Sequence, residues 1–167
     1  CYTLNRLTNG NNKAPHLTVG IPKAKPVSKI IVAQPNALTQ SKQIFEAETA
    51  GRNGPSVAKN NGGYTGKGYI DFQASSGEHL NWLIRTKSAG GHTLIFRYAL
   101  TDGSRPLQLK VNGKVIIKTL PFASTGSWTN WKTLTTTASL KAGVNDIRLE
   151  STGSSGPNID NLTIERN

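Results

Sequence analysis

The stretch LQLKVNGKVIIKTL, residues 107–120, constrains the fold more than any other part of the sequence. Apolar and polar residues alternate from Leu107 to Val111, which is the period of a strand with one buried face. The next two residues, Asn112 and Gly113, form the dipeptide preferred in a type I′ turn, and a second β-type run follows them. The stretch therefore predicts a β-hairpin.

Short β-type runs continue along the chain from residue 43, separated by clusters of Gly, Asn, Asp, Ser or Pro. No stretch holds a helical period for three turns. The predicted fold class is all-β, a two-sheet antiparallel β-sandwich of jelly-roll type. The expected strands are residues 43–48, 57–59, 68–72, 78–86, 92–99, 107–111, 114–119, 131–138, 144–150 and 159–165.

Residues 1–42 differ from the rest of the chain in composition. They mix Asn, Gly, Lys and Pro, show no sustained period, and contain only a short run at 29–33 that could pair as an edge strand. We interpret 1–42 as a basic linker or the remnant of a preceding domain, and 43–167 as the β-sandwich. Cys1 is the only cysteine, so an internal disulfide is impossible. It is either the lipid-modified first residue of a bacterial lipoprotein or simply a boundary of the excised chain.

The charge of the chain indicates a polyanionic partner. Lys and Arg number 20 against nine Asp and Glu, giving a net charge of +11. Nucleic acid is not favoured, because aromatic residues make up only 7% of the chain, the lysines are scattered and no RNP-like run occurs. A binder of single-stranded DNA is kept only as a distant alternative. No apolar run approaches the ~20 residues that span a bilayer, so we expect no transmembrane segment.

Catalytic patterns are scarce in the sequence. There is no GxSxG, HExxH or CxxC motif, and His16, His79 and His92 match no metal-binding spacing. Glu46 and Glu48 lie two residues apart in the run IFEAE, so on a strand they would share a face at roughly 7 Å. They would not oppose each other across a cleft as the two carboxylates of a glycosidase do. We therefore predict no catalytic residues.

Two features point to a ligand. In TGSWTNW, Trp128 and Trp131 differ in parity, so one can enter the core while the other faces outward. The strand that follows favours Trp131 as the core residue, which leaves Trp128 in a loop as a flat apolar platform for a sugar ring or as a cap on the sandwich. In GPNIDNL, Asn158 is either a donor and acceptor for sugar hydroxyls or a turn residue. Asp160 could share the environment of the glutamate pair.

The motifs FEAE, GGYTGKGYIDF, RYALTDGSRPLQLKVNG, TGSWTNW and GPNID, in this order, closely resemble the carbohydrate-binding modules of families 35 and 6. The resemblance covers about residues 43–165 and leaves 1–42 unmatched. Each motif alone is weak, but five in order with suitable spacing are strong.

The resemblance implies a β-sandwich with a structural calcium, bound in these families by the acids of the E-A-E and N-I-D motifs. Those positions are Glu46, Glu48 and Asp160 here, and carboxylates are the anionic donors that Ca²⁺ prefers. It also implies a sugar site at the loop end of the sandwich. The corresponding residues are an aromatic of the Gly-Tyr segment, the first tryptophan of W-x-x-W and the asparagine before I-D, which are Tyr64 or Tyr69, Trp128 and Asn158.

The implied function is a non-catalytic carbohydrate-binding module that targets a tethered catalytic domain to a polysaccharide or oligosaccharide. Several family 35 modules recognise uronic acids, and the positive charge here agrees with an acidic glycan, uronic or sulfated. Lys67, Arg97 or Arg105 could meet a carboxylate or sulfate. We expect a monomer in an extracellular or cell-surface location. The alternatives are a small polysaccharide lyase or glycosidase, and an adhesion or structural domain without a live sugar site; the sugar and the parent enzyme are left open.

Overall fold

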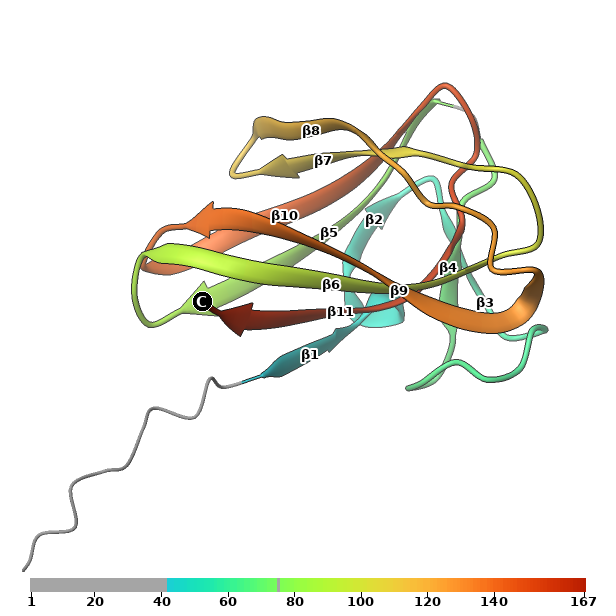
Figure 1. Cartoon of the computed structure of the whole chain (residues 1–167), viewed down its shortest axis with the longest axis horizontal. Helices are drawn as coiled ribbons and strands as arrows, with labels where there is room; N and C mark the ends of the chain where they lie inside the picture. The colour runs from blue at the N-terminus through green and yellow to red at the C-terminus, as the bar shows by residue number, and fades with distance from the viewer. Residues whose placement is uncertain (1–41, 75) are drawn as a thin grey trace, which may run out of the picture. The chain divides into compact units, whose positions relative to one another are not determined.

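The computed structural model describes residues 42–74 and 76–167, whose strands form two antiparallel sheets packed face to face (Figure 1). The first sheet has the order β3-β4-β11-β6-β9, with β1 also paired to β11, and the second has the order β2-β5-β10-β7-β8. The bounds are β1 Gln43–Glu46, β2 Gly51–Asn53, β3 Ser56–Ala58, β4 Tyr69–Asp71, β5 Ser76–Thr86, β6 Gly90–Leu100, β7 Leu107–Val111, β8 Lys114–Leu120, β9 Ser127–Leu140, β10 Gly143–Thr152 and β11 Asn158–Arg166.

The predicted sandwich class is confirmed, and so is the hairpin. Strands β7 and β8 pair with Val111 opposite Lys114. The two turn residues between them have positive φ, 51° at Asn112 and 79° at Gly113, as a type I′ turn requires. Asn-Gly suits this turn because neither residue pays a large steric cost for a left-handed backbone.

The core fills the space between the two sheets and comes from the alternating apolar residues of the long strands. In β7 the buried and half-buried residues alternate strictly, and β10 follows the same period through Leu149. Three aromatic rings meet at the centre, with the Phe96 ring centroid 6.1 Å from that of Trp82 and 6.2 Å from that of Phe122. Burial of this surface is the main favourable contribution to folding.

The first predicted strand, 43–48, is wrong in its second half. Strand β1 ends at Glu46, and Ala47–Thr49 form one turn of 3-10 helix, η1. Ala47 is buried and Phe45 packs against the core, as an inward-facing pair should, but the two glutamates do not share a strand face. The short strand β2 has no apolar residue and was missed for that reason. This turn is the only helix in the described part of the chain, so no helix there is long enough to cross a membrane.

The expectations that fall on residues 1–41 lie outside the described residues. These are most of the 1–42 linker or domain remnant, the edge strand at 29–33, and the lipidated or boundary role of Cys1.

Two register shifts in the first sheet decide where the polar residues point. Between β11 and β6 the register shifts at Ile159/Asn161, with Ile159 in the core and its neighbour Asp160 on the outer side of the sheet. Between β6 and β9 it shifts after Tyr98, so that Leu100 pairs with Ser127. Both shifts lie toward the loop end of the sandwich.

Candidate functional site

The three carboxylates Glu46, Glu48 and Asp160, here called the carboxylate cluster, come from β1, η1 and β11 and converge on one loop segment. The Thr65 hydroxyl donates to Glu46 Oε2 at 2.8 Å, and the Thr65 N–H donates to Asp160 Oδ1 at 2.9 Å. The Lys67 N–H donates to Glu48 Oε1 at 2.6 Å. The cluster therefore ties the two terminal strands of the sandwich to residues 65–67.

Burial dominates the electrostatics of the cluster. Asp160 is 0% exposed, and its Oδ2 accepts from the Arg97 guanidinium. Burial still raises the pKa of Asp160 above its usual value, although Arg97 and Thr65 act in the opposite direction. Burial also raises the pKa of Glu46, assisted by the charges of Asp160 and Glu48 and opposed by the hydrogen bond from Thr65. The cluster thus carries excess negative charge in a poorly solvated place.

Gly66 allows the loop to approach the carboxylates this closely. Its φ is +64°, and a Cβ at this position would lie 2.3 Å from Glu48 Oε1 and 3.0 Å from the carboxyl carbon of Glu46. Glycine is therefore required both by the backbone conformation and by the space.

The chemistry of the cluster fits a hard cation in part. Three carboxylates offer oxygen donors of the kind that Ca²⁺ prefers, and Glu48 Oε2 is buried without a hydrogen-bond partner among the described residues. However, no three Asp, Glu, His or Cys side chains within 42–74 and 76–167 are arranged so that they could hold a metal ion as they stand. The assignment of Glu46, Glu48 and Asp160 as calcium ligands therefore stays a prediction.

A second group of side chains lies on the outer face of the first sheet. Tyr69 is 1% exposed and lies between Tyr64, at 5.7 Å between ring centroids, and Trp131, at 5.4 Å. Its hydroxyl donates to Asn60 Oδ1 and accepts from Asn61 Nδ2. A buried ring with a satisfied hydroxyl has no free face, so Tyr69 as a sugar-stacking residue is wrong, and Tyr64, which is half-buried, is the tyrosine that keeps exposed surface.

The predicted placement of the two tryptophans is wrong, while the ligand-binding role of Trp128 stays a prediction. Trp128 packs against the core, whereas Trp131 lies outside it, with its Nε1 donating to the Gly62 carbonyl at 2.9 Å and with Arg97 over its ring. Trp131 lies three residues before Leu134, which packs against the core, so the two side chains point to opposite faces of β9. Both indoles are half-buried, so Trp128 keeps part of its ring surface open to a ligand.

At the loop end, Trp128 belongs to a surface that also contains Arg105, Ser155 and Asn158, here called the loop-end surface. The Arg105 guanidinium carbon lies 5.3 Å from the centroid of the Trp128 ring, and its Nη1 donates to Ser155 Oγ at 3.2 Å. Asn158 begins β11 opposite Ala99, beside the Leu100–Ser127 pair that leads to Trp128. Asn158 is only 3% exposed, so its contact with a ligand stays a prediction.

Of the three basic candidates, the structure brings only Arg105 to Trp128. Arg97 is engaged with Asp160 and Trp131, and the Lys67 contact to the carboxylate cluster is made by its backbone N–H. Sequence reasoning missed Asp71. Burial, assisted by the charge of Glu78, raises the pKa of its carboxyl group above the usual value, although the charge of Arg105 acts in the opposite direction. The motif GYIDF contains Asp71, but only the pairing of Ile70 with Ile159 brings it to this end of the sheet.

Comparison with known proteins agrees with this architecture. The family model described as carbohydrate binding module (family 6) matches residues 46–166. An exo-β-D-glucosaminidase from Amycolatopsis orientalis is 38% identical over 122 residues, which are 72% of this chain and 12% of the enzyme. The chain therefore spans only a small part of the length of this curated relative.

Solved structures show the same similarity over nearly their whole length. A family 35 module from Paenibacillus barcinonensis is 38% identical, with a TM-score of 0.72, over 73% of this chain and 97% of that one. A further family 35 module, solved with a disaccharide containing glucuronic acid, is 31% identical, with a TM-score of 0.65, over 72% of this chain and 91% of that one. The chain belongs to the carbohydrate-binding modules, with a sequence that matches the family 6 model and a fold shared with family 35 modules.

Proposed function

We propose that this carbohydrate-binding module binds an acidic glycan, containing uronic acid or sulfate, at the loop-end surface. The observation that carries the proposal is the pairing of Arg105 with Trp128. An indole can accept the C–H face of a sugar ring, while a guanidinium can bind a carboxylate or sulfate through two parallel hydrogen bonds. The two side chains together match a sugar ring that bears an anionic group.

Two further observations support this assignment. Residues 43–167 contain 14 Lys and Arg against nine Asp and Glu, so the module itself is basic with a net charge of +5, which favours association with polyanions. One similar family 35 module has been solved with a disaccharide that contains glucuronic acid.

The test is calorimetric titration of the protein with a glucuronic acid-containing oligosaccharide. We expect Trp128→Ala to abolish measurable binding, because it removes the platform. Trp131→Ala is the matched control, since Trp131 is also a half-buried indole but lies on the outer face of the first sheet. Equal loss in both variants, or unchanged binding by Trp128→Ala, would contradict the loop-end surface as the glycan site. Incubation with uronate polymers should yield no unsaturated product; its appearance would indicate a lyase.

A structural calcium ion belongs to the proposal, with Glu46, Glu48 and Asp160 as its ligands. Support comes from the excess negative charge of the carboxylate cluster and from the unpartnered Glu48 Oε2. A bound cation would offset the repulsion between the carboxylates and strengthen the link between β1 and β11. At about a hundredfold excess over Kd, calcium would add ~2.7 kcal/mol to the free energy of unfolding. The midpoint of thermal unfolding should therefore fall in EDTA in the unmodified protein and not in Glu48→Gln; an equal midpoint with and without EDTA would refute it.

We place the module outside the cell, as a monomer tethered to a carbohydrate-active catalytic domain. The similarity to a short part of a much longer glucosaminidase supports the tether. Weak binding by the module would then raise the local concentration of the enzyme on its substrate. The measurement is the rate of polysaccharide hydrolysis by the parent enzyme with Trp128 intact and with Trp128→Ala; equal rates on an insoluble substrate would argue against a targeting role.

A further inference from the structure

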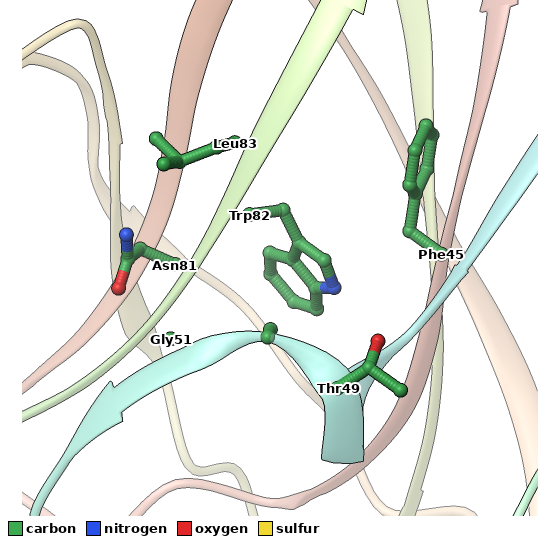
Figure 2. Close-up of a pocket in the computed structure, with 7 residues that line it drawn as sticks. Phe45, Thr49, Gly51, Asn81, Trp82 and Leu83 are labelled. Carbon is green, nitrogen blue, oxygen red and sulfur yellow. The ribbon is translucent and has the colours of Figure 1, made fainter.

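A pocket of about 280 Å³ opens at the side of the sandwich, and none of its lining residues belongs to the carboxylate cluster or to the loop-end surface (Figure 2). One wall comes from the end of β1, η1 and the start of β2, with Phe45, Thr49 and Gly51. The other comes from the middle of β5, with Asn81, Trp82 and Leu83. Strand β1 belongs to the first sheet, whereas β2 and β5 are paired strands of the second, so the pocket lies where β1 and η1 meet the β2–β5 pair.

The lining of this side pocket combines aromatic faces with polar groups and no charge. Phe45 and Trp82 supply rings, and Leu83, which is 70% exposed, supplies an aliphatic rim. Asn81 offers an amide with both donor and acceptor atoms, and Thr49 offers a hydroxyl. Specific small-molecule sites have this composition, apolar walls with a few placed polar groups.

Trp82 provides a second, independent sign of a ligand. Its side chain is only 3% exposed, and its Nε1 has no hydrogen-bond partner among the described residues. A buried indole N–H usually has an acceptor, so a lone one beside a pocket needs an explanation. In the view of Figure 2 the indole lies among the lining residues, with its nitrogen on the side of Phe45 and Thr49. An oxygen atom of a molecule in the pocket would satisfy it.

The missing side chain at Gly51 leaves room for the Asn81 amide on the pocket wall. Gly51 pairs with Asn81 across the β2–β5 ladder, and a Cβ on Gly51 would lie 2.8 Å from Asn81 Oδ1. Any larger residue would push the Asn81 amide out of its present position. The glycine thus permits the close approach that places this amide on the pocket wall.

We propose that the side pocket is a second saccharide-binding site, which takes one neutral pyranose residue. A pyranose ring has an apolar C–H face for the half-buried Phe45, and hydroxyl oxygens that can accept from the indole N–H of Trp82 and from Asn81. The volume is near the lower end of the range for small-molecule sites, which suits one ring and not a chain. The absence of charged side chains among the lining residues favours a neutral sugar, in contrast to the acidic ligand proposed for Arg105 and Trp128.

The test uses the indole N–H resonances of the full protein, which contains three tryptophans. The resonances are assigned with single Trp→Phe variants, and methyl glucoside, methyl galactoside and methyl mannoside are then titrated separately to high millimolar concentrations. We expect at least one of them to shift the Trp82 resonance in a saturable way. The shift should persist in Trp128→Ala, which separates this site from the loop-end surface.

Two variants at the rim complete the test. Thr49 is exposed, and Thr49→Phe adds a ring over the opening, so the Kd of the glycoside should rise at least ~tenfold. Thr49→Ser keeps the hydroxyl and should leave this Kd unchanged. Leu83→Ala, also at an exposed position, should weaken binding without a change in the remaining spectrum. The proposal is overturned by a Trp82 resonance that none of the three glycosides shifts, by a shift that survives Thr49→Phe in a folded protein, or by one that is lost in Trp128→Ala.

Discussion

Replacement of Arg105 by alanine is the sharpest test of the acidic-glycan assignment, because it separates recognition of charge from recognition of the sugar ring. Arg105 lies against Trp128 and reaches Ser155, so its side chain belongs to the loop-end surface. We expect Arg105→Ala to remove the preference for a glucuronic acid-containing disaccharide over its uncharged counterpart, while binding of the uncharged sugar continues.

The expected magnitude follows from the environment of Arg105. A hydrogen bond to a charged group contributes about 1.5–3 kcal/mol to stability or binding. Arg105 is half-buried, so solvent screens part of its charge and the lower end applies. A loss of ~1.5 kcal/mol corresponds to a roughly tenfold weaker Kd for the acidic disaccharide. The uncharged sugar should change by no more than about threefold, because a cation–π contact at a solvated site contributes only ~0.5–1 kcal/mol.

The assay is isothermal titration of the unmodified protein and the variant with both disaccharides, at low and at high salt. Arg85→Ala is the control, since Arg85 is an exposed arginine of β5 and its removal lowers the net charge by the same amount. The reasoning is refuted by a variant that keeps the acidic preference. It is equally refuted by Arg85→Ala losing that preference to the same extent, because the effect would then come from overall charge.

Three further predictions concern stability, each measured as the free energy of unfolding. Gly66→Ala should cost about 1–2 kcal/mol for the left-handed backbone alone. Because its Cβ would meet Glu48, it should also reduce the stabilisation gained on adding calcium. Equal stability of the variant and the unmodified protein would mean that the loop moves freely. Burial by itself would raise the pKa of Glu150, but the hydrogen bond from Lys110 and neighbouring positive charges outweigh it and lower the pKa. Glu150 therefore stabilises the fold at pH values above its pKa in the unfolded chain, and this stabilisation is lost as the pH falls through its pKa in the folded protein. Glu150→Gln should cost roughly 0.5–1 kcal/mol near neutral pH and nothing in strong acid. A difference in stability that stays constant with pH would exclude this ion pair as the cause. Phe96→Ala, at the buried centre of the core, should cost about 3–5 kcal/mol, and a cost below that of a surface substitution would contradict the packing described here.

The fold could be predicted from the sequence to a large extent because its signals are local. Alternation in 107–111 and the Asn-Gly turn specify a hairpin without any tertiary information, and both are as expected. The strand ends were less predictable. Residues 47–49 continue the alternating pattern of β1, so the local sequence predicts strand there. The helical turn at Ala47–Thr49 instead accompanies a tertiary contact, the hydrogen bond from the loop at residues 65–67 to Glu48.

The candidate site was less accessible to sequence reasoning, because it depends on which face of each strand meets the core and on strand pairing. Parity shows only that Trp128 and Trp131 can face opposite sides; the side is set by Leu134, Ala138 and Leu140, which face the core and are out of phase with Trp131. Tyr69 was a candidate because a Gly-Tyr pair occurs twice, and nothing in the sequence reveals that Trp131 and Tyr64 cover it. Asp71 and Arg105 belong to two motifs that are far apart in sequence, and only the folded structure brings their charges together.

The antiparallel pairing of β1 with β11 has a mechanical consequence. Gln43 lies opposite Ile164, so a force that separates the two ends of the sandwich acts across this ladder and opens its hydrogen bonds one after another. Peeling would proceed along β1 until it reached Glu46 and Glu48, whose bonds to Thr65 and Lys67 attach the same segment to a loop. Under load, the sandwich would thus yield first at β1, and the hydrogen bonds of the carboxylate cluster would oppose further unravelling toward the core.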